Sequence, residues 1–444
     1  MTALGYPRQR SMTKPAGLIG VAAVFACWCV FAFSRPTVLT EIPTLLFTVG
    51  FIVVLLLNGA RLAFPMIIMS FPAFLLLTAV WTTDRFSAVA GAGVMGVIAI
   101  SGAMVATNLP LPRLIRALDI AVKCILIVSA ALALISPTLG RALSGSNEGV
   151  FVGIYGTKNM FGTLLALGMV THIYSPIRKD LRFFFWVGAY AIAVFTVGSV
   201  GAALSIGIAV VVGIVLWISR RSSAGVTRSL LRQSPLLIVL GVVFSINFES
   251  LLSSFDRDMT FSGRDLIWRG SIEALARQPW AGYGWNQAFS EGDEAAGIIR
   301  SYTNWYVSSS HNGLLTIALQ VGLVGAVLGA WIMLRAVVLS LREYALHASL
   351  NSAWLVQMSV LFITANLVES RFQWLMWFII SVTVTCVQKS HTRKVADGGA
   401  VCSNSVGGAM SPAGTLPSVA PLGLEHGVVM AERDAGVVQS ERRT

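Results

Sequence analysis

The chain has 444 residues, of which 55% are hydrophobic and only 12% are charged, and its mean hydropathy is +0.75. A soluble protein with so few charges could not cover its surface, so this composition indicates a membrane protein. The formal net charge of +12 does not gather in one soluble region, which argues against nucleic acid as a partner.

Apolar stretches recur along most of the chain. About 20 apolar residues are needed to cross roughly 30 Å of hydrocarbon. We expect about twelve transmembrane helices, at about 16–33, 42–57, 62–80, 86–106, 118–136, 158–174, 183–198, 200–218, 235–250, 313–334, 353–368 and 373–388. The sequence therefore predicts an all-α polytopic membrane domain over 16–388. Residues 389–444, rich in Gly, Ser, Ala and Val, lack the bulk to bury a core and predict a disordered tail.

Basic residues in the short loops predict the orientation. If residues 1–15, with Arg8, Arg10 and Lys14, are cytoplasmic, alternate loops carry most of the lysines and arginines. Cytoplasmic loops of membrane proteins carry this excess. We therefore expect both termini in the cytoplasm and a large non-cytoplasmic loop over 251–312.

The sequence "GTKN" places Lys158 at the entry to the helix expected over 158–174. A cation at this position can approach an anionic headgroup or a ligand phosphate. The alternative is a lysine that snorkels to the membrane interface.

The large loop contains the stretch "SGRDLIWRGSIEALARQP", residues 262–279, which predicts a short amphipathic helix. Ser262 and Asp265 form an S-x-x-D capping box, and Pro279 ends the helix. Arg264 then lies in the first turn, where the helix dipole disfavours a cation. A guanidinium beside free backbone N–H groups favours phosphate binding, and the alternative is a solvated arginine.

Aromatic residues are frequent in the same loop. They are Trp268, Trp280, Trp285 and Trp305, which are four of the twelve tryptophans, and Tyr283, Tyr302 and Tyr306. Such rings suit stacking on sugars or resting at the lipid interface. The acidic runs at 256–258 and 291–294 lack the partners of a metal site, so we interpret them as solvated carboxylates and expect no metal.

His311 is the only one of the five histidines that we expect on the non-cytoplasmic side. It lies where the loop enters the helix expected over 313–334. An imidazole titrates near neutral pH, so acid–base work by a histidine on that side falls to His311. The alternative is a histidine that only bonds its neighbours at the end of the loop.

Three segments in order resemble the O-antigen ligase and polymerase superfamily of bacterial envelope glycosyltransferases. They are "GTKN", "SGRDLIWRGSIEALARQPWAGYGWNQAF" and "SSSHNGLLTIALQVGLVG", and the resemblance covers about 155–330. It implies a GT-C-like fold in the bacterial inner membrane. It also implies inverting, metal-independent and cofactor-free transfer of a glycan from undecaprenyl pyrophosphate at the outer leaflet.

The resemblance also implies roles for individual residues. The family's loop arginine maps onto Arg264 and the histidine of its H-N-x-L motif onto His311. We expect His311 to be catalytic, Arg264 and Lys158 to bind pyrophosphate, and the glycan to contact Trp268, Tyr283, Trp285, Trp305 and Asn312. One departure is Val200 after Ser199, where the family often has a basic residue. That phosphate contact is therefore missing or supplied by another residue such as Lys158.

The leading hypothesis is a polymerase that joins lipid-linked exopolysaccharide or O-antigen repeat units. A flippase and a chain-length regulator are its expected protein partners. One alternative is a ligase that transfers finished glycan to the lipid A core. Another is a transporter of lipid-linked sugars, which the scarcity of charges in the expected spans disfavours.

Overall fold

The computed structural model describes residues 38–57, 66–108, 110–142, 148–155, 157–176, 178–221 and 263–369. All of them belong to one compact unit, Met1–Lys394. Within these ranges the regular structure is helical, apart from an isolated antiparallel bridge between Arg141 and Phe151. The spans expected at 16–33, 235–250 and 373–388, the acidic run at 256–258 and the tail at 389–444 lie outside the described residues.

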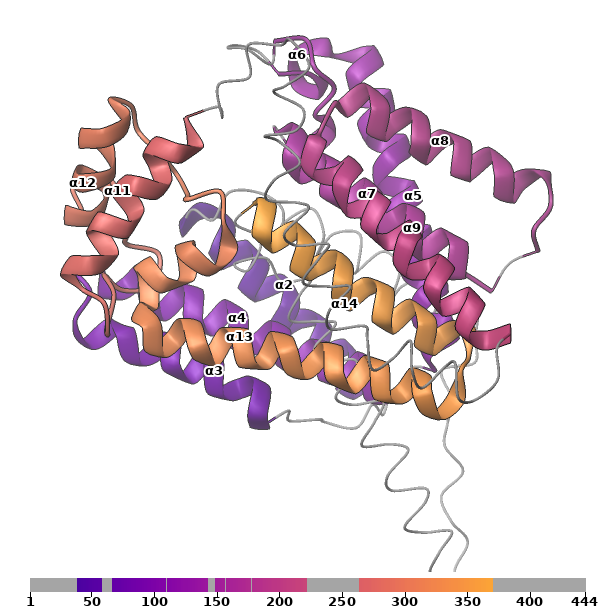
Figure 1. Ribbon diagram of the computed structural model, residues 1–444, viewed down its shortest axis with the longest axis horizontal. Coiled ribbons are helices and arrows are strands. Elements are labelled where there is room, and N and C mark those ends of the chain that lie inside the picture. Colours follow the sequence, from indigo (N-terminus) through magenta and orange to yellow (C-terminus); the bar gives the residue numbers. More distant parts are fainter. Residues whose placement is uncertain are drawn as a thin grey trace, which may run out of the picture. The chain divides into compact units, whose positions relative to one another are not determined.

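Every expected span that falls within the described residues corresponds to a helix. These helices are α2 (Val38–Leu57), α3 (Met66–Leu77) with η1 (Thr78–Val80), α4 (Arg85–Asn108), α5 (Leu111–Ile135), α7 (Lys158–Tyr174), α8 (Leu181–Val197), α9 (Val200–Arg221), α13 (Gly313–His347) and α14 (Leu350–Val368). The remaining elements are α6 (Pro137–Gly140), η3 (Gly153–Tyr155), α11 (Arg264–Arg277) and α12 (Glu294–Thr303) (Figure 1).

Five described stretches are long and apolar enough to cross a membrane. They are Arg85–Met104, Leu111–Ile135, Val200–Arg220, Gly313–His347 and Leu350–Leu367. Two shorter apolar stretches, Met66–Val80 and Leu181–Val197, accompany them. The described residues therefore agree with a multi-pass, all-α membrane protein, and the count of about twelve spans stays a prediction.

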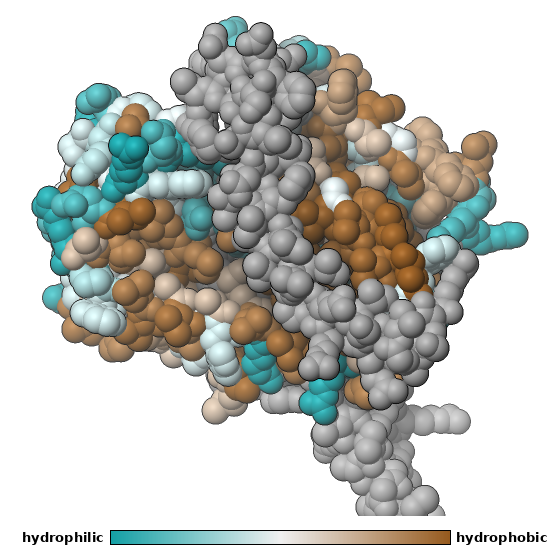
Figure 2. Space-filling model, viewed as in Figure 1, coloured by the Kyte–Doolittle hydropathy of each residue, from teal (hydrophilic) through white to brown (hydrophobic). Residues whose placement is uncertain are grey.

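Hydrophobic and hydrophilic surfaces separate along the described chain. Figure 2 shows that hydrophilic residues gather over α11 and α12, whereas the surface over α9 is hydrophobic. The exposed side chains of α9 include Val211, Ile214 and Trp217, each more than half exposed. An exposed apolar face of this kind suits contact with lipid.

Small residues bring the helices around α7 close together. A Cβ atom on Gly162 of α7 would lie 2.8 Å from the Cβ atoms of Ser199 and Ala202 at the start of α9. Close helix approach at small residues is the usual packing mode within membranes. Helix α14 in turn contacts α7, α9 and α13 (Figure 1). This packing holds the first turns of α7 and α9 beside the end of α14.

A buried polar network ties α5, α7 and α8 together. The Asp119 carboxylate accepts hydrogen bonds from Lys123 at 2.8 Å and pairs with His172 Nδ1 at 3.0 Å. The other ring nitrogen of His172 lies 3.2 Å from the carbonyl oxygen of Phe183. Lys123 also lies over the ring of Trp186. Because these groups satisfy one another, the network acts as an anchor between helices.

Helix α13 is broken at Gly322, whose φ of 68° and ψ of 180° are not helical. The backbone groups at this break bond to the segment 279–284. Leu323 N donates to Pro279 O at 2.7 Å, and Tyr283 N donates to Leu319 O at 2.9 Å. A Cβ atom on Gly322 would collide with the carbonyl of Trp280. The break therefore requires glycine and fastens the segment between α11 and α12 to α13.

Candidate functional site

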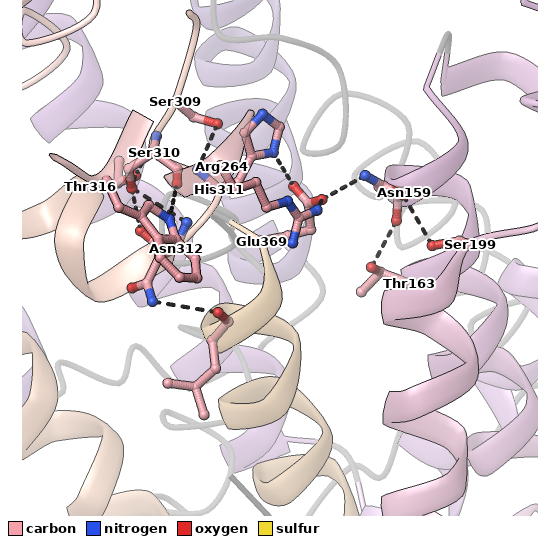
Figure 3. Close-up of polar contacts among 12 residues, drawn as sticks. Asn159, Thr163, Ser199, Arg264, Ser309, Ser310, His311, Asn312, Thr316 and Glu369 are labelled. Carbon is pink, nitrogen blue, oxygen red and sulfur yellow. Dashed lines mark hydrogen bonds and ion pairs between the residues drawn. The ribbon is translucent and has the colours of Figure 1, made fainter. Parts of the chain in front are cut away.

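The N-termini of four helices meet around the carboxylate of Glu369, the residue that follows α14. Asn159 lies in the first turn of α7, Ser199 precedes α9, Arg264 begins α11, and His311 lies just before α13. Figure 3 shows their side chains joined through Glu369 and Asn159. Helix N-termini carry partial positive charge, so this arrangement favours an anion.

Glu369 bonds to three of these side chains directly. Its Oε1 accepts hydrogen bonds from Asn159 Nδ2 at 2.5 Å and from Arg264 at 2.9 Å. Its Oε2 lies 2.9 Å from His311 Nδ1. Ser199 extends the set by donating to Asn159 Oδ1 at 3.1 Å. The Glu369 and Arg264 side chains are 11% and 13% exposed, so their ion pair is only weakly screened by water.

The imidazole of His311 is held with one nitrogen toward Glu369. A carboxylate accepts hydrogen bonds, so this contact favours the tautomer with the hydrogen on Nδ1. Nε2 then keeps its lone pair, and no described residue bonds to it. The side chain is 34% exposed. His311 can therefore accept a proton from a group that approaches Nε2.

The backbone at His311 is constrained from both sides. Its φ is 52°, a left-handed conformation that costs a non-glycine residue about 1 kcal/mol or more. The neighbouring Ser310 is fully buried, donates from Oγ to Asn312 O at 2.7 Å and accepts a bond from Trp268 Nε1 on its carbonyl at 2.9 Å. Trp268 therefore links α11 to the loop that carries His311.

Asn312 is the N-cap of α13. Its Oδ1 accepts from Leu315 N at 3.1 Å, and its Nδ2 lies 3.5 Å from Leu367 O in α14. A Cβ on the next residue, Gly313, would lie 2.5 Å from Asn366 Oδ1. The side chain of Asn312, an expected glycan contact, thus bonds to the first turn of α13 and to α14 in this structure.

Arg264 is the first residue of α11, as expected, but the cap differs from the prediction. The N-cap is Gly263, with φ of 72° and no side-chain cap bond, in place of the predicted Ser262, which lies outside the described residues. Gly263 has no Cβ, and one placed there would lie 2.5 Å from the Trp305 ring. The glycine therefore permits the indole to lie directly beside the start of α11.

Lys158 is the first residue of α7, next to Asn159. Its side chain is half-buried and has no hydrogen bond or ion pair with any described residue. Its ammonium group therefore has no counter-ion among the described residues, and the next residue in the chain, Asn159, bonds to Glu369.

The expected aromatic contacts fall into two groups. Trp285 and Tyr283 are only 3% and 6% exposed, and Tyr283 donates its hydroxyl to Ala274 O at 2.9 Å. Burial raises the pKa of Tyr283 to about 12. Trp268 is half-buried and uses its indole N–H within the protein. Trp305, at 44% exposed, is the member of the predicted set that offers an open ring.

Two of the acidic residues at 291–294 contact other parts of the protein. Asp293 caps α12 by accepting from Ala295 N at 2.9 Å, and Glu294 pairs with Arg277 of α11 at 3.6 Å. Across the described ranges, no group of three or more His, Cys, Asp or Glu side chains is arranged to hold a metal ion.

Sequence reasoning did not assign Glu369 to the site. The stretch "NLVESR" shows only a charged residue where an apolar span ends. Glu369 is 58 residues from His311, 105 from Arg264 and 210 from Asn159. The feature that could have pointed to Glu369 is a carboxylate at the end of a predicted span, on the side of the membrane where His311 and Arg264 are expected.

Two sequence comparisons relate this chain to known proteins. Residues 149–330 match the family described as O-Antigen ligase. The chain is also similar to the exopolysaccharide production protein ExoQ of Rhizobium meliloti (strain 1021), with 26% identity over 106 residues. That alignment covers 22% of this chain and 23% of the relative. Both comparisons support the resemblance to the O-antigen ligase and polymerase superfamily, and the family match lies over residues 149–330.

Proposed function

We propose that this chain is an inverting, metal-independent glycosyltransferase that polymerises undecaprenyl-pyrophosphate-linked repeat units of an exopolysaccharide or O-antigen. It acts at the outer leaflet of the bacterial inner membrane, with both termini in the cytoplasm. The observation that carries the proposal is that His311 and Arg264 share one carboxylate. A base and a phosphate-binding cation are thereby held within one small site.

The reaction needs only these two kinds of group. His311 Nε2 takes the proton of the acceptor hydroxyl while the oxygen attacks the anomeric carbon of the donor sugar. The bond from that carbon to the pyrophosphate oxygen breaks, and its electron pair leaves with the lipid pyrophosphate. A single displacement inverts the anomeric centre, so the carboxylate pair of a glycosidase is not required.

The charge that develops on pyrophosphate meets several positive groups. Arg264 carries a planar guanidinium whose forked geometry suits phosphate oxygens, and Lys158 adds a point charge. The N-termini of α7, α9, α11 and α13 add oriented backbone N–H groups. We infer that Lys158 and the N-terminus of α9 take the place of the basic residue that the family often has at Val200.

The glycan contacts divide according to exposure. We propose that Trp305 touches sugar directly, whereas Trp268, Tyr283, Trp285 and Asn312 hold the surrounding segment in place. A flippase that supplies the donor and a regulator of chain length complete the proposed set of partners.

The test is the lipid-linked glycan profile of a deletion strain complemented with wild-type protein or with His311→Ala. We expect the variant to accumulate single lipid-linked units and to form no polymer. His347→Ala is the matched control, because this histidine lies at the other end of α13 and should support normal polymer. Normal polymer from a stably inserted His311→Ala protein would overturn the proposal.

The same experiment separates the polymerase from the ligase. A ligase mutant should accumulate long chains on undecaprenyl pyrophosphate, whereas a polymerase mutant should accumulate single units. The name of the relative, an exopolysaccharide production protein, favours the polymerase. A transporter of lipid-linked sugars would form no glycosidic bond, so bond formation by the purified protein in detergent excludes that alternative.

A further inference from the structure

Trp305 lies against the residue that precedes Arg264. A Cβ atom on Gly263 would be 2.5 Å from Cη2 and 2.6 Å from Cζ2 of this indole. The ring therefore occupies the space that any side chain at position 263 would fill. Arg264 follows directly and reaches Glu369 at 2.9 Å. An exposed indole thus lies against the residue that precedes Arg264 at the start of α11.

The backbone of Trp305 is fixed by buried groups. Thr303 is 2% exposed, donates its hydroxyl to Trp305 O at 2.9 Å and accepts a longer bond from Trp305 N at 3.4 Å. Asn304 between them takes a left-handed conformation with φ of 61° and ends α12. Fixing a ring before a ligand arrives reduces the ordering cost of binding.

The indole itself remains available for a ligand. The side chain is 44% exposed, and its Nε1–H has no hydrogen bond to any described residue. Trp268 differs, because its N–H bonds to Ser310 O, and Tyr306 differs because its hydroxyl bonds to Phe289 O. Trp305 therefore combines an open ring, an N–H group without a partner among the described residues, and a place against Gly263, the residue before Arg264.

We propose that Trp305 forms the subsite for the sugar ring attached directly to the donor's pyrophosphate, an inference that rests on the proposed function. The first sugar is bonded directly to the phosphate that Arg264 would hold, and the indole lies against the residue that precedes Arg264. The apolar C–H face of a pyranose stacks on the ring, and a sugar hydroxyl accepts from Nε1–H. The site is thus built for a glycosylated lipid pyrophosphate in preference to the bare one.

The experiment measures binding without turnover, in purified full-length His311→Ala protein in detergent. The probes are the lipid-linked unit isolated from the His311→Ala strain and the same lipid pyrophosphate after removal of its glycan. We expect the glycosylated probe to bind about three- to tenfold more tightly, a gain typical of one aromatic contact. Adding Trp305→Ala should abolish this preference and leave the affinity for the bare lipid unchanged.

Two further variants make the result specific. Trp305→Phe keeps a stacking face and should retain part of the preference. Trp280→Ala removes another exposed tryptophan of the same segment, 70% exposed, and should retain all of it. If Trp305→Ala keeps the preference, or loses affinity for both probes equally, the subsite is overturned while the proposed function stands. If Arg264→Ala weakens neither probe, the proposed function fails.

Discussion

The substitution Glu369→Gln tests whether the carboxylate sets the protonation of His311. Glutamine has nearly the size of glutamate, and its carbonyl oxygen can still accept from Asn159 and Arg264. Its NH₂ group, however, replaces the oxygen that lies 2.9 Å from His311 Nδ1. A donor facing Nδ1 favours the tautomer with the proton on Nε2. The nitrogen proposed as the base then has no lone pair to accept the acceptor's proton.

The expected loss follows from the contribution of a general base. Such catalysis contributes about 10²–10⁴ in rate, and each factor of ten corresponds to about 1.36 kcal/mol. We therefore expect kcat to fall by about 10²–10⁴-fold, which is roughly 2.7–5.5 kcal/mol in the barrier. KM for the donor should change far less, because Arg264 and Lys158 keep their charges.

The assay is polymer formation by purified protein from the isolated lipid-linked unit. Glu343→Gln is the matched control, since Glu343 is also a buried carboxylate beside a histidine, 3.6 Å from His347, but lies near the other end of α13. It should keep the wild-type rate. A folded Glu369→Gln protein that works within about threefold of wild type, or that loses only donor affinity, would refute the tautomer argument.

Three stability predictions concern other parts of the structure, each measured by thermal unfolding in detergent. Gly322→Ala places a Cβ against the carbonyl of the 279–284 segment at φ of 68° and should cost about 3 kcal/mol or more; Gly188→Ala, with open space around it, should be neutral or stabilising. Asp119→Ala leaves the half-buried Lys123 ammonium and the buried His172 ring without their carboxylate partner and should cost about 3–5 kcal/mol. Burial raises the pKa of Asp293 above its ordinary value of 3.8, so the folded state binds this proton more tightly than the unfolded state does. The free energy of unfolding should therefore fall as the pH rises from about 3.8 through the raised pKa. Asp293→Asn keeps the cap and should remove this dependence; an unchanged pH profile would contradict it.

The helices could be predicted well from hydropathy, and their ends less well. The span expected at 313–334 belongs to a helix that continues to His347. Hydropathy falls at Arg335 and Arg342 because these residues are charged, but a charged residue does not interrupt the backbone hydrogen bonds of a helix. The break at Gly322 could not be predicted from hydropathy, because it depends on a tertiary contact with the 279–284 segment.

Site residues could be predicted from the sequence only where the residue type and its position alone indicate a chemical role. His311 and Arg264 could be proposed because their types and positions are unusual, and the structure places both beside Glu369. Glu369 itself gave no local signal, because its role depends on partners far away in sequence. Burial decides the aromatic residues, and composition alone cannot separate the enclosed Trp285 from the open Trp305.

The segment from Arg264 to His311 carries the two residues of the proposed chemistry at its ends. Contacts between these ends hold the segment in place: Trp268 bonds to Ser310 O, and residues 279–284 bond to the backbone of α13. Helix α12 and the turn before it carry none of the proposed transfer chemistry. In the proposed reaction the sugar contact at Trp305 is separate from the base and the phosphate-binding cation. Such a division would let the proposed enzyme change its glycan product during evolution without rebuilding its reaction.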